Sequence, residues 1–292
     1  PADRHRRRGG DDWGTIETMN AKTRKIRLSN GMPHQARKRF GQNFLHDEQV
    51  IARIVDAIDP KPDQHLLEIG PGQGAITDLI AKAGGPLDCV ELDRDLADFL
   101  EKRFARHGNV AIHQQDILKF DLAALNNRSS KLRIIGNLPY NISTPVMFHL
   151  LQNAKLIEDM TFMLQLEVIQ RMISNVGKRN YGRLSLMVQY YCEVEHLFNV
   201  ASSAFSPKPK VVSALVRLKP HNSTSIRAKD SDCLQTVIRT AFNQRRKTLR
   251  NSLKSFKKIE NIKEHSIFDK RAEELDVDDY IFLTNLLSNG NI

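Results

Sequence analysis

The stretch EIGPGQG, residues 68–74, decides the fold of this chain. It ends an apolar run over residues 65–70, which predicts a strand, and it leads into a predicted helix over residues 75–83. Glycines at a turn from strand to helix let the backbone bend sharply and approach a ligand closely. Glu91 ends the next predicted strand, where its carboxylate could accept hydrogen bonds from both hydroxyls of a ribose. The spacing fits NAD and S-adenosylmethionine alike, so both remain possible ligands at this point.

Strands and helices alternate outward from this turn. Apolar runs predict strands over residues 65–70, 87–92, 110–114, 132–136 and 160–164, and helical spacing predicts helices over 75–83, 94–106, 144–151 and from Glu167 onward. This alternation is typical of an α/β fold with a mostly parallel, doubly wound sheet. Two further strands, over 194–200 and 211–218, have no helix between them, so we expect them to be antiparallel and to extend one edge of the sheet. Beyond a polar stretch, the sequence predicts helices over 233–242, 247–256 and 277–287.

Positive charge is concentrated in two parts of the chain. The 292 residues hold 44 Lys and Arg against 34 Asp and Glu, a formal net charge of +10. Seven basic residues and no acid lie within residues 21–40, and eight and no acid within residues 233–258. Such clusters are typical of proteins that hold a phosphate backbone. In the second cluster, four side chains are spaced to share a helix face and are candidates for nucleic-acid contacts: Arg245, Arg246, Lys247 and Arg250.

Composition excludes several classes of protein. The chain is 40% hydrophobic and 27% charged, which is ordinary for a globular protein and excludes collagen and wholesale disorder. No run of 18 apolar residues occurs, so we expect no membrane partner. No charged stretch is followed by an apolar one of the length that a signal peptide has, so we do not expect secretion. Cys89, Cys192 and Cys233 lie far apart without a CxxC pair, so we expect neither a disulfide framework nor a metal site. These features favour a cytoplasmic protein.

The loop Asn137-Leu138-Pro139-Tyr140, which follows the fourth predicted strand, suits methyl transfer to the exocyclic amine of a base. The lone pair of that nitrogen is delocalised into the ring. The Asn137 side-chain oxygen and a backbone carbonyl of the loop could bind its two hydrogens and draw it toward a tetrahedral shape. Proline makes the loop rigid, Tyr140 offers a ring on which the base can stack, and Phe205 could form the other side of the pocket. An ordinary turn with a buried tyrosine, and a core aromatic at Phe205, are the alternatives.

Acidic residues end three of the predicted strands. Glu68, Glu91 and Asp116 together predict an anionic rim, which suits a sulfonium cation better than a pyrophosphate. Asp116 could accept a hydrogen bond from an adenine amine, although alone it would more often be a helix cap. NAD chemistry would leave the loop at Asn137 unexplained. The sequence therefore favours S-adenosylmethionine.

From about Arg37 to its C-terminus, the chain resembles the KsgA-type small-subunit ribosomal RNA adenine dimethyltransferases. The motifs that carry the resemblance are RFGQNFL at 39–45, EIGPGQG at 68–74, ELD at 91–93, QD at 115–116, NLPYNIST at 137–144, YGRLS at 181–185, AFSPKPKVVS at 204–213 and NQRRKTLRNSL at 243–253. The resemblance implies a Rossmann-like class I methyltransferase that uses S-adenosylmethionine, releases S-adenosylhomocysteine and needs no metal. It implies dimethylation of two adjacent adenosines in the 3′-terminal hairpin of 16S rRNA, within an immature 30S particle late in assembly.

The resemblance also implies roles for individual residues. The implied donor contacts are Asn43, Leu45, Gly70, Glu91, Asp116 and Asn137, and residues 137–140 would surround the target base. We expect a flexible basic extension over residues 1–36, with 1–18 a leader or added segment, a methyltransferase domain over 37–222, and a small helical RNA-binding domain over 223–292. We expect a monomer. The family usually has a basic residue where this chain has Leu166, which puts one RNA contact in doubt.

Three other functions remain as alternatives. A related family methylates one adenosine of large-subunit rRNA, but the segment NQRRKTLRNSL favours the small-subunit branch. A DNA adenine methyltransferase would share the chemistry of the site. The basic clusters would also suit an assembly factor whose contact with the immature subunit matters more than its methylation.

Overall fold

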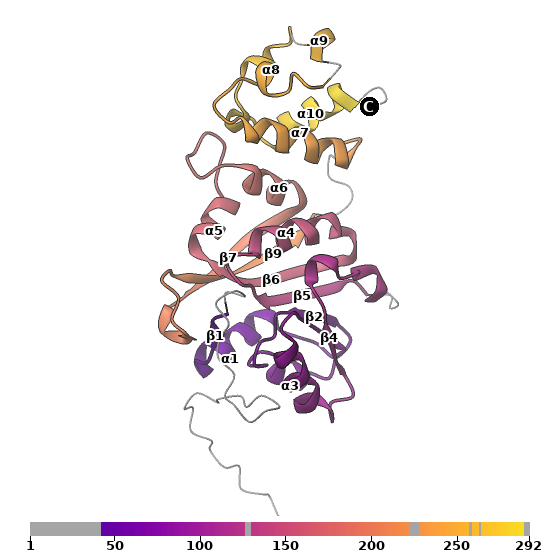
Figure 1. Ribbon diagram of the computed structural model, residues 1–292, viewed down its shortest axis with the longest axis vertical. Coiled ribbons are helices and arrows are strands. Elements are labelled where there is room, and N and C mark those ends of the chain that lie inside the picture. The colour runs from indigo at the N-terminus through magenta and orange to yellow at the C-terminus, as the bar shows by residue number, and fades with distance from the viewer. Residues whose placement is uncertain (1–41, 126–129, 222–227, 257–258, 263, 289–292) are drawn as a thin grey trace, which may run out of the picture.

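A seven-stranded sheet forms the middle of the molecule (Figure 1). The computed structural model describes residues 42–125, 130–221, 228–256, 259–262 and 264–288, so the predicted extension over 1–36 and the basic cluster over 21–40 lie outside the described residues. The strands are β2 (His65–Ile69), β3 (Leu87–Glu91), β4 (Val110–Gln114), β5 (Leu132–Asn137), β6 (Ile157–Gln165), β7 (Cys192–Val200) and β9 (Ser213–Pro220). Their order across the sheet is β4-β3-β2-β5-β6-β9-β7.

The directions of the strands confirm the predicted topology. Strands β4, β3, β2, β5 and β6 run parallel to one another. Strand β9 is antiparallel to both β6 and β7, so the last two strands extend one edge as expected. Because the five parallel strands share one direction, their carboxyl ends meet at the same edge of the sheet, where ligands of such folds bind.

Helices cover both faces of the sheet (Figure 1). One layer contains α1 (Glu48–Ile58), α2 (Thr77–Ala81) and α3 (Arg94–Phe104), and the other contains α4 (Ser143–Gln152), α5 (Leu166–Met172) and α6 (Arg183–Tyr191). Successive strand residues point to opposite layers: Ile134 packs with the α4 layer and Ile135 with the α1 layer. The doubly wound arrangement predicted from the sequence is therefore confirmed.

Helix α1 was missing from the sequence prediction. Its residues Ile51, Ile54 and Ile58 recur at helical spacing and are buried against the sheet. The Asp47 carboxylate accepts hydrogen bonds of 3.1 Å from the backbone N–H groups of Gln49 and Val50, which makes Asp47 the N-cap. The signal was present in the sequence as an aspartate before isoleucines spaced three and four residues apart.

The C-terminal segment is helical, as predicted, and packs on α6 (Figure 1). Its helices are α7 (Ser231–Asn243), α8 (Leu249–Ser252), α9 (Ile259–Ile262) and α10 (Val277–Ser288). Short 3-10 helices complete the chain: η2 (Ile117–Lys119), η3 (Leu122–Leu125), η4 (Ala154–Leu156), η5 (Ser202–Ala204), η6 (Ser266–Asp269) and η7 (Ala272–Glu274). Buried apolar side chains of α6, α7 and α10 belong to the same cluster as those of the sheet, so one core joins the two parts.

The helix predicted over residues 247–256 is wrong in its extent. Helix α7 ends at Asn243, a turn follows, and α8 covers only Leu249–Ser252. Thr248 is extended because its backbone forms a bridge with Arg271, which lies far along the chain. A long-range backbone contact of this kind leaves no mark in the local pattern.

Candidate active site

A cavity of about 350 Å³ lies at the carboxyl ends of β2, β3 and β5. Its volume is typical of a site for a small molecule. Every residue predicted to contact the donor lines it, namely Asn43, Leu45, Gly70, Glu91, Asp116 and Asn137. The rest of the predicted catalytic loop, Leu138, Pro139 and Tyr140, lines it too. The structure thus brings together residues that are up to 97 positions apart in the sequence, from Asn43 to Tyr140.

The glycine turn forms the floor of this cavity, and Phe44 packs against it. Gly70 has a φ of +64° and Gly72 a φ of +58°, the left-handed region in which side chains are rarely found. A Cβ added to Gly72 would lie 3.2 Å from the ring of Phe44. Glycine is therefore required at position 72 both by the backbone conformation and by the close approach of Phe44.

Glu91 is fixed by the backbone on both sides of its carboxylate. Its Oε2 accepts a hydrogen bond of 3.1 Å from the N–H of Gly72, and its Oε1 accepts one of 2.9 Å from the N–H of Asp93. Burial raises the pKa of Glu91, although these two amide bonds oppose the shift. Each oxygen keeps a second lone pair, so the carboxylate can still accept hydroxyl hydrogens from a ligand.

Glu68 lines the cavity together with Glu91 and Asp116, but its carboxyl is almost fully buried. Its side chain points from β2 under α2, where it is 2% exposed and accepts a hydrogen bond of 2.6 Å from the Thr77 hydroxyl. Burial raises the pKa of Glu68 to about 7, with the Thr77 bond opposing and the charges of Glu91 and Asp78 adding to the shift. Near neutral pH this carboxyl is therefore only partly ionised.

Asp116 is a helix cap, which was one of the two roles that the sequence left open, and it also lies at the cavity. Its Oδ1 accepts a hydrogen bond of 3.0 Å from the N–H of Leu118, so it caps the 3-10 helix η2. It also lines the cavity, beside Gln115 and Ile117. A carboxylate held by a cap is already oriented before a ligand arrives.

The segment Gln42 to Leu45 crosses the cavity and is tied to three parts of it. Asn137 Nδ2 donates a hydrogen bond of 3.0 Å to the backbone oxygen of Asn43, and Gln42 Nε2 donates one of 3.1 Å to Asp93 Oδ2. Strand β1 (Phe44–Leu45) pairs with β8 (Phe205–Ser206) in a two-stranded antiparallel sheet. The bond to Asn43 uses the amide nitrogen of Asn137 and leaves the oxygen as an acceptor.

Tyr140 is held in the cavity wall by a residue that the sequence did not single out. Its hydroxyl lies 2.6 Å from the hydroxyl of Ser213, which is fully buried at the start of β9. This bond restricts the ring of Tyr140 while leaving it half-buried at the cavity. Ser213 and Phe44 both belong to the resembling motifs, and that was the only sequence signal for either.

Phe205 does not lie where the base pocket was predicted. It is 1% exposed, pairs with Leu45 through β8 and packs in the core beneath the cavity rather than in the residues that line it. The alternative of a core aromatic describes its position. Its apolar ring is buried because β8 is drawn against β1, a pairing of segments some 160 residues apart.

The basic C-terminal residues are not on one helix face, and two of them are paired with acids. Arg245 forms an ion pair with Glu273 and donates to the backbone oxygen of Arg179 at 3.2 Å. Arg250 lies 2.6 Å from Asp269. Arg245, Arg246 and Lys247 lie in the turn after α7, whereas Arg250 lies in α8. Of these four residues, Arg246 and Lys247 are exposed.

No group of three His, Cys, Asp or Glu side chains suited to a metal ion occurs in the part of the chain that the structure describes. Within those same residues, every helix is too short or too polar to cross a membrane. Cys89, Cys192 and Cys233 are all buried.

The chain is similar to known proteins over most of its length. A family model described as "Ribosomal RNA adenine dimethylase" matches residues 33–288. The chain is 54% identical over 262 residues to the ribosomal RNA small subunit methyltransferase A of Pseudomonas syringae pv. tomato, a match that covers 89% of this chain and 98% of that protein. It is 51% identical to the protein of that name from Marinobacter nauticus, with 90% of this chain and 95% of that protein covered.

Two solved structures share the fold. A dimethyladenosine transferase from Plasmodium falciparum matches with a TM-score of 0.69 and 26% identity, covering 84% of this chain and 96% of that chain. The 23S rRNA methyltransferase ErmE matches with a TM-score of 0.62 and 25% identity, covering 85% of this chain and 100% of that chain.

Proposed function

Because the chain belongs to the ribosomal RNA adenine dimethylase family, we propose that it transfers methyl groups from S-adenosylmethionine to the exocyclic amines of two adjacent adenosines in 16S rRNA. The adenosines lie in the hairpin loop near the 3′ end of that RNA, and the reaction takes place on an immature 30S particle in the cytoplasm. The observation that carries the proposal is that the glycine turn, Glu91 and the Asn137 loop meet in one cavity.

The residues of the cavity fit such a donor. Glu91 keeps lone pairs for the ribose hydroxyls, and Asp116 is oriented to accept from the adenine amine. Apolar side chains such as Leu45 and Ile76 line the same space, and carboxylates at its floor favour a positively charged ligand. When bound, the donor supplies a methyl group on a sulfonium sulfur, and S-adenosylhomocysteine is the product that leaves.

The Asn137 loop acts on the acceptor base. The Asn137 oxygen and a carbonyl of the loop accept the two hydrogens of the adenine amine, which turns the nitrogen lone pair out of the ring plane. Tyr140, held by Ser213, offers a ring for stacking with the extruded base, worth about 1–3 kcal/mol. The adenine nitrogen forms its bond to the methyl carbon as the bond from that carbon to sulfur breaks, and the nitrogen then loses a proton to water.

This chemistry needs positioning more than acid–base groups. Bringing the two reactants together in an aligned geometry can remove about 7–11 kcal/mol from the barrier of a bimolecular step. The fixed hydrogen bonds of Glu91, Asp116 and Asn137 supply that alignment. The first methyl transfer leaves one hydrogen on the nitrogen, so only one acceptor of the loop can be used in the second transfer.

RNA binding is assigned to the exposed basic side chains of the C-terminal part. Arg246 and Lys247 are exposed and can reach RNA. Arg245 and Arg250 form ion pairs with Glu273 and Asp269, so their main role is to stabilise the fold of this segment. The protein acts as a monomer in this proposal. Leu166 carries no charge, so the RNA contact expected of a basic residue at this position would be made by Arg246 and Lys247 instead.

Incubation with radiolabelled S-adenosylmethionine and 30S particles from a strain that lacks the modification tests the proposal. Mass spectrometry of the 3′-terminal hairpin should find two dimethylated adenosines. Parallel reactions with 50S particles and with duplex DNA test a large-subunit or a DNA substrate. Methylation in either of these reactions with none in the 30S hairpin would contradict the proposal. If a transfer-deficient variant still restored 30S maturation in cells, the assembly role would be the dominant one.

A further inference from the structure

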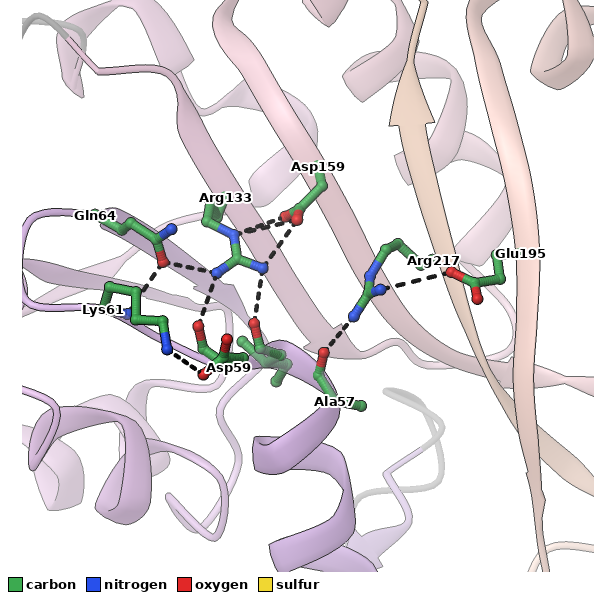
Figure 2. A network of polar contacts seen from close by, with 9 residues as sticks. Ala57, Asp59, Lys61, Gln64, Arg133, Asp159, Glu195 and Arg217 are labelled. Atoms are coloured by element: carbon green, nitrogen blue, oxygen red, sulfur yellow. Dashed lines mark hydrogen bonds and ion pairs between the residues drawn. The ribbon is translucent and has the colours of Figure 1, made fainter.

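Helix α1 is held at its carboxyl end by Arg133, a residue of β5 (Figure 2). Arg133 Nη2 donates to the backbone oxygen of Ile58 at 2.7 Å, and Nη1 donates to that of Asp59 at 3.3 Å. The same guanidinium is fixed from behind by Asp159, whose Oδ2 lies 2.9 Å from Nη2. The last carbonyls of a helix have no partner within the helix, so such donors stabilise its end, and their charge suits the helix dipole.

A second guanidinium, from another strand, holds the same end of α1. Arg217 of β9 donates through Nη2 to the backbone oxygen of Ala57, while its Nη1 lies 3.5 Å from Glu195 Oε2 (Figure 2). Three successive carbonyls, those of Ala57, Ile58 and Asp59, are thus bound by two arginines. A polar cavity of about 760 Å³ adjoins both arginines.

The other end of α1 leads directly into the donor-covering segment, residues 42–45. Asp47 caps the helix, and the N–H of His46 donates to the backbone oxygen of Ala204 at 3.0 Å. Beyond them, Asn43, Phe44 and Leu45 line the candidate donor cavity. An α-helix of 11 residues is a stiff rod of about 16 Å, so the position of one end determines that of the other.

The two strands that hold α1 also carry the acceptor side of the active site. Arg133 is the second residue of the strand that ends at Asn137, and Arg217 lies in the middle of the strand that begins at Ser213, the partner of Tyr140. Because β9 is antiparallel to β6, its amino end at Ser213 lies at the same edge of the sheet as the carboxyl end of β5. Helix α1 therefore connects Arg133 and Arg217, which lie back from this edge, with the donor cavity at it. The same two strands therefore position both the donor-covering segment and the base-binding loop.

We propose that Arg133 and Arg217 are positioning residues, which hold α1 so that the donor-covering segment lies in register with Asn137. The inference rests on the proposed function, since it takes the cavity to be the donor site. Without one of these donors, the segment spends part of its time out of register, and donor affinity falls in proportion to the fraction in register. The loss of one hydrogen bond corresponds to about a fivefold change in that equilibrium.

Arg217→Met provides the direct test, with Glu195→Gln as its matched control. Glu195 contacts Arg217 but not α1, and its side chain is 64% exposed. We expect Arg217→Met to raise the Kd for S-adenosylmethionine, measured by calorimetry, by up to about fivefold, with kcat at saturating donor within twofold of the wild type. Hydrogen exchange at residues 42–47 should speed up in Arg217→Met and not in Glu195→Gln. Arg217→Lys keeps a donor at this position and should restore most of the affinity.

A merely structural role for Arg217 would give a different pattern. It would lower the midpoint of thermal unfolding while leaving both the donor Kd and the exchange at residues 42–47 unchanged in the folded protein, and this result would overturn the proposal. Arg133→Lys extends the test to the more buried arginine. One ammonium group cannot hold both carbonyls and Asp159 in the geometry of the guanidinium, so here lysine should raise the donor Kd and speed up exchange at residues 42–47. If the wild-type chain bound no S-adenosylmethionine, the proposed function would fail instead, so the two failures are distinguishable.

Discussion

The donor cavity and the basic segment over residues 244–250 both carry charged side chains, and they hold them in different ways. In the cavity, Glu91 is buried and both of its oxygens accept backbone N–H groups. In the basic segment, Arg245 pairs with one carboxylate near the surface and Arg250 with two, those of Asp269 and Glu264. Their neighbours Arg246 and Lys247 are exposed. Desolvated groups with fixed partners act through geometry, whereas exposed cations act through charge that salt can screen. The difference predicts large effects of single atoms in the cavity and small, additive, salt-dependent effects in the segment.

Asn137→Ala should have the largest effect. We expect single-turnover methyl transfer at saturating donor to fall by a factor on the order of 10²–10³, because one oriented acceptor at the reacting nitrogen is lost. Donor affinity, measured by calorimetry, should fall by less than about tenfold, since the other donor contacts remain. Asn141 also lines the cavity but is exposed, so Asn141→Ala is the control for a general change next to the loop and should stay within twofold. Equal losses in both variants would show that the loop has no special acceptor.

Glu68 tests how strongly the cavity excludes water. Its pKa in the folded chain, about 7, lies above that of the unfolded chain, so the stability it contributes is complete below about pH 4.5 and is lost as pH rises through 7. A shift of this size corresponds to about 3 kcal/mol of unfolding free energy. Urea titrations between pH 5 and 8 should show this decline in the wild type and a flatter profile in Glu68→Gln. Identical profiles would mean that the carboxyl is solvated.

In the basic segment, substitution of the exposed residues should change RNA affinity only through the charge that is removed. We expect Arg246→Gln with Lys247→Gln to weaken 16S rRNA binding about tenfold at low salt and to reduce the slope of log affinity against log salt by about 2. The thermal unfolding midpoint should not change. Arg245→Gln with Arg250→Gln should instead lower that midpoint, because the ion pairs to Glu273 and Asp269 are lost. If the second pair of substitutions weakened RNA binding more than the first, the assignment of roles would be reversed.

The bond between Tyr140 and Ser213 should give the smallest effect. Tyr140→Phe and Ser213→Ala each remove one hydroxyl of the 2.6 Å contact and keep the rest of the side chain. We expect each to reduce kcat about fivefold, and the double variant to lose no more than either single one. Additive losses in kcat would show that the two hydroxyls act separately.

The same contrast explains what the sequence could predict. The glycine turn and Glu91 were identified because their conformation and partners come from neighbouring strands and turns. Asn137 was identified from its motif alone, since its partner Asn43 lies 94 residues away. The parallel sheet and its antiparallel edge followed from the alternation of elements. In contrast, the position of Phe205 depends on β1, and that of Arg245 depends on Glu273, 28 residues away. Contacts of this kind arise only when remote segments meet, so local pattern could not reveal them.

The apolar layer under α4 and α6 draws on residues from Leu67 in β2 to Leu287 in α10. Nearly the whole described chain must therefore be present before this layer can close. Contacts between residues so far apart slow folding and leave apolar surface open during synthesis. A nascent chain that has not yet released α10 from the translating ribosome should remain sensitive to protease in this layer, so the core closes only after α10 has left the ribosome.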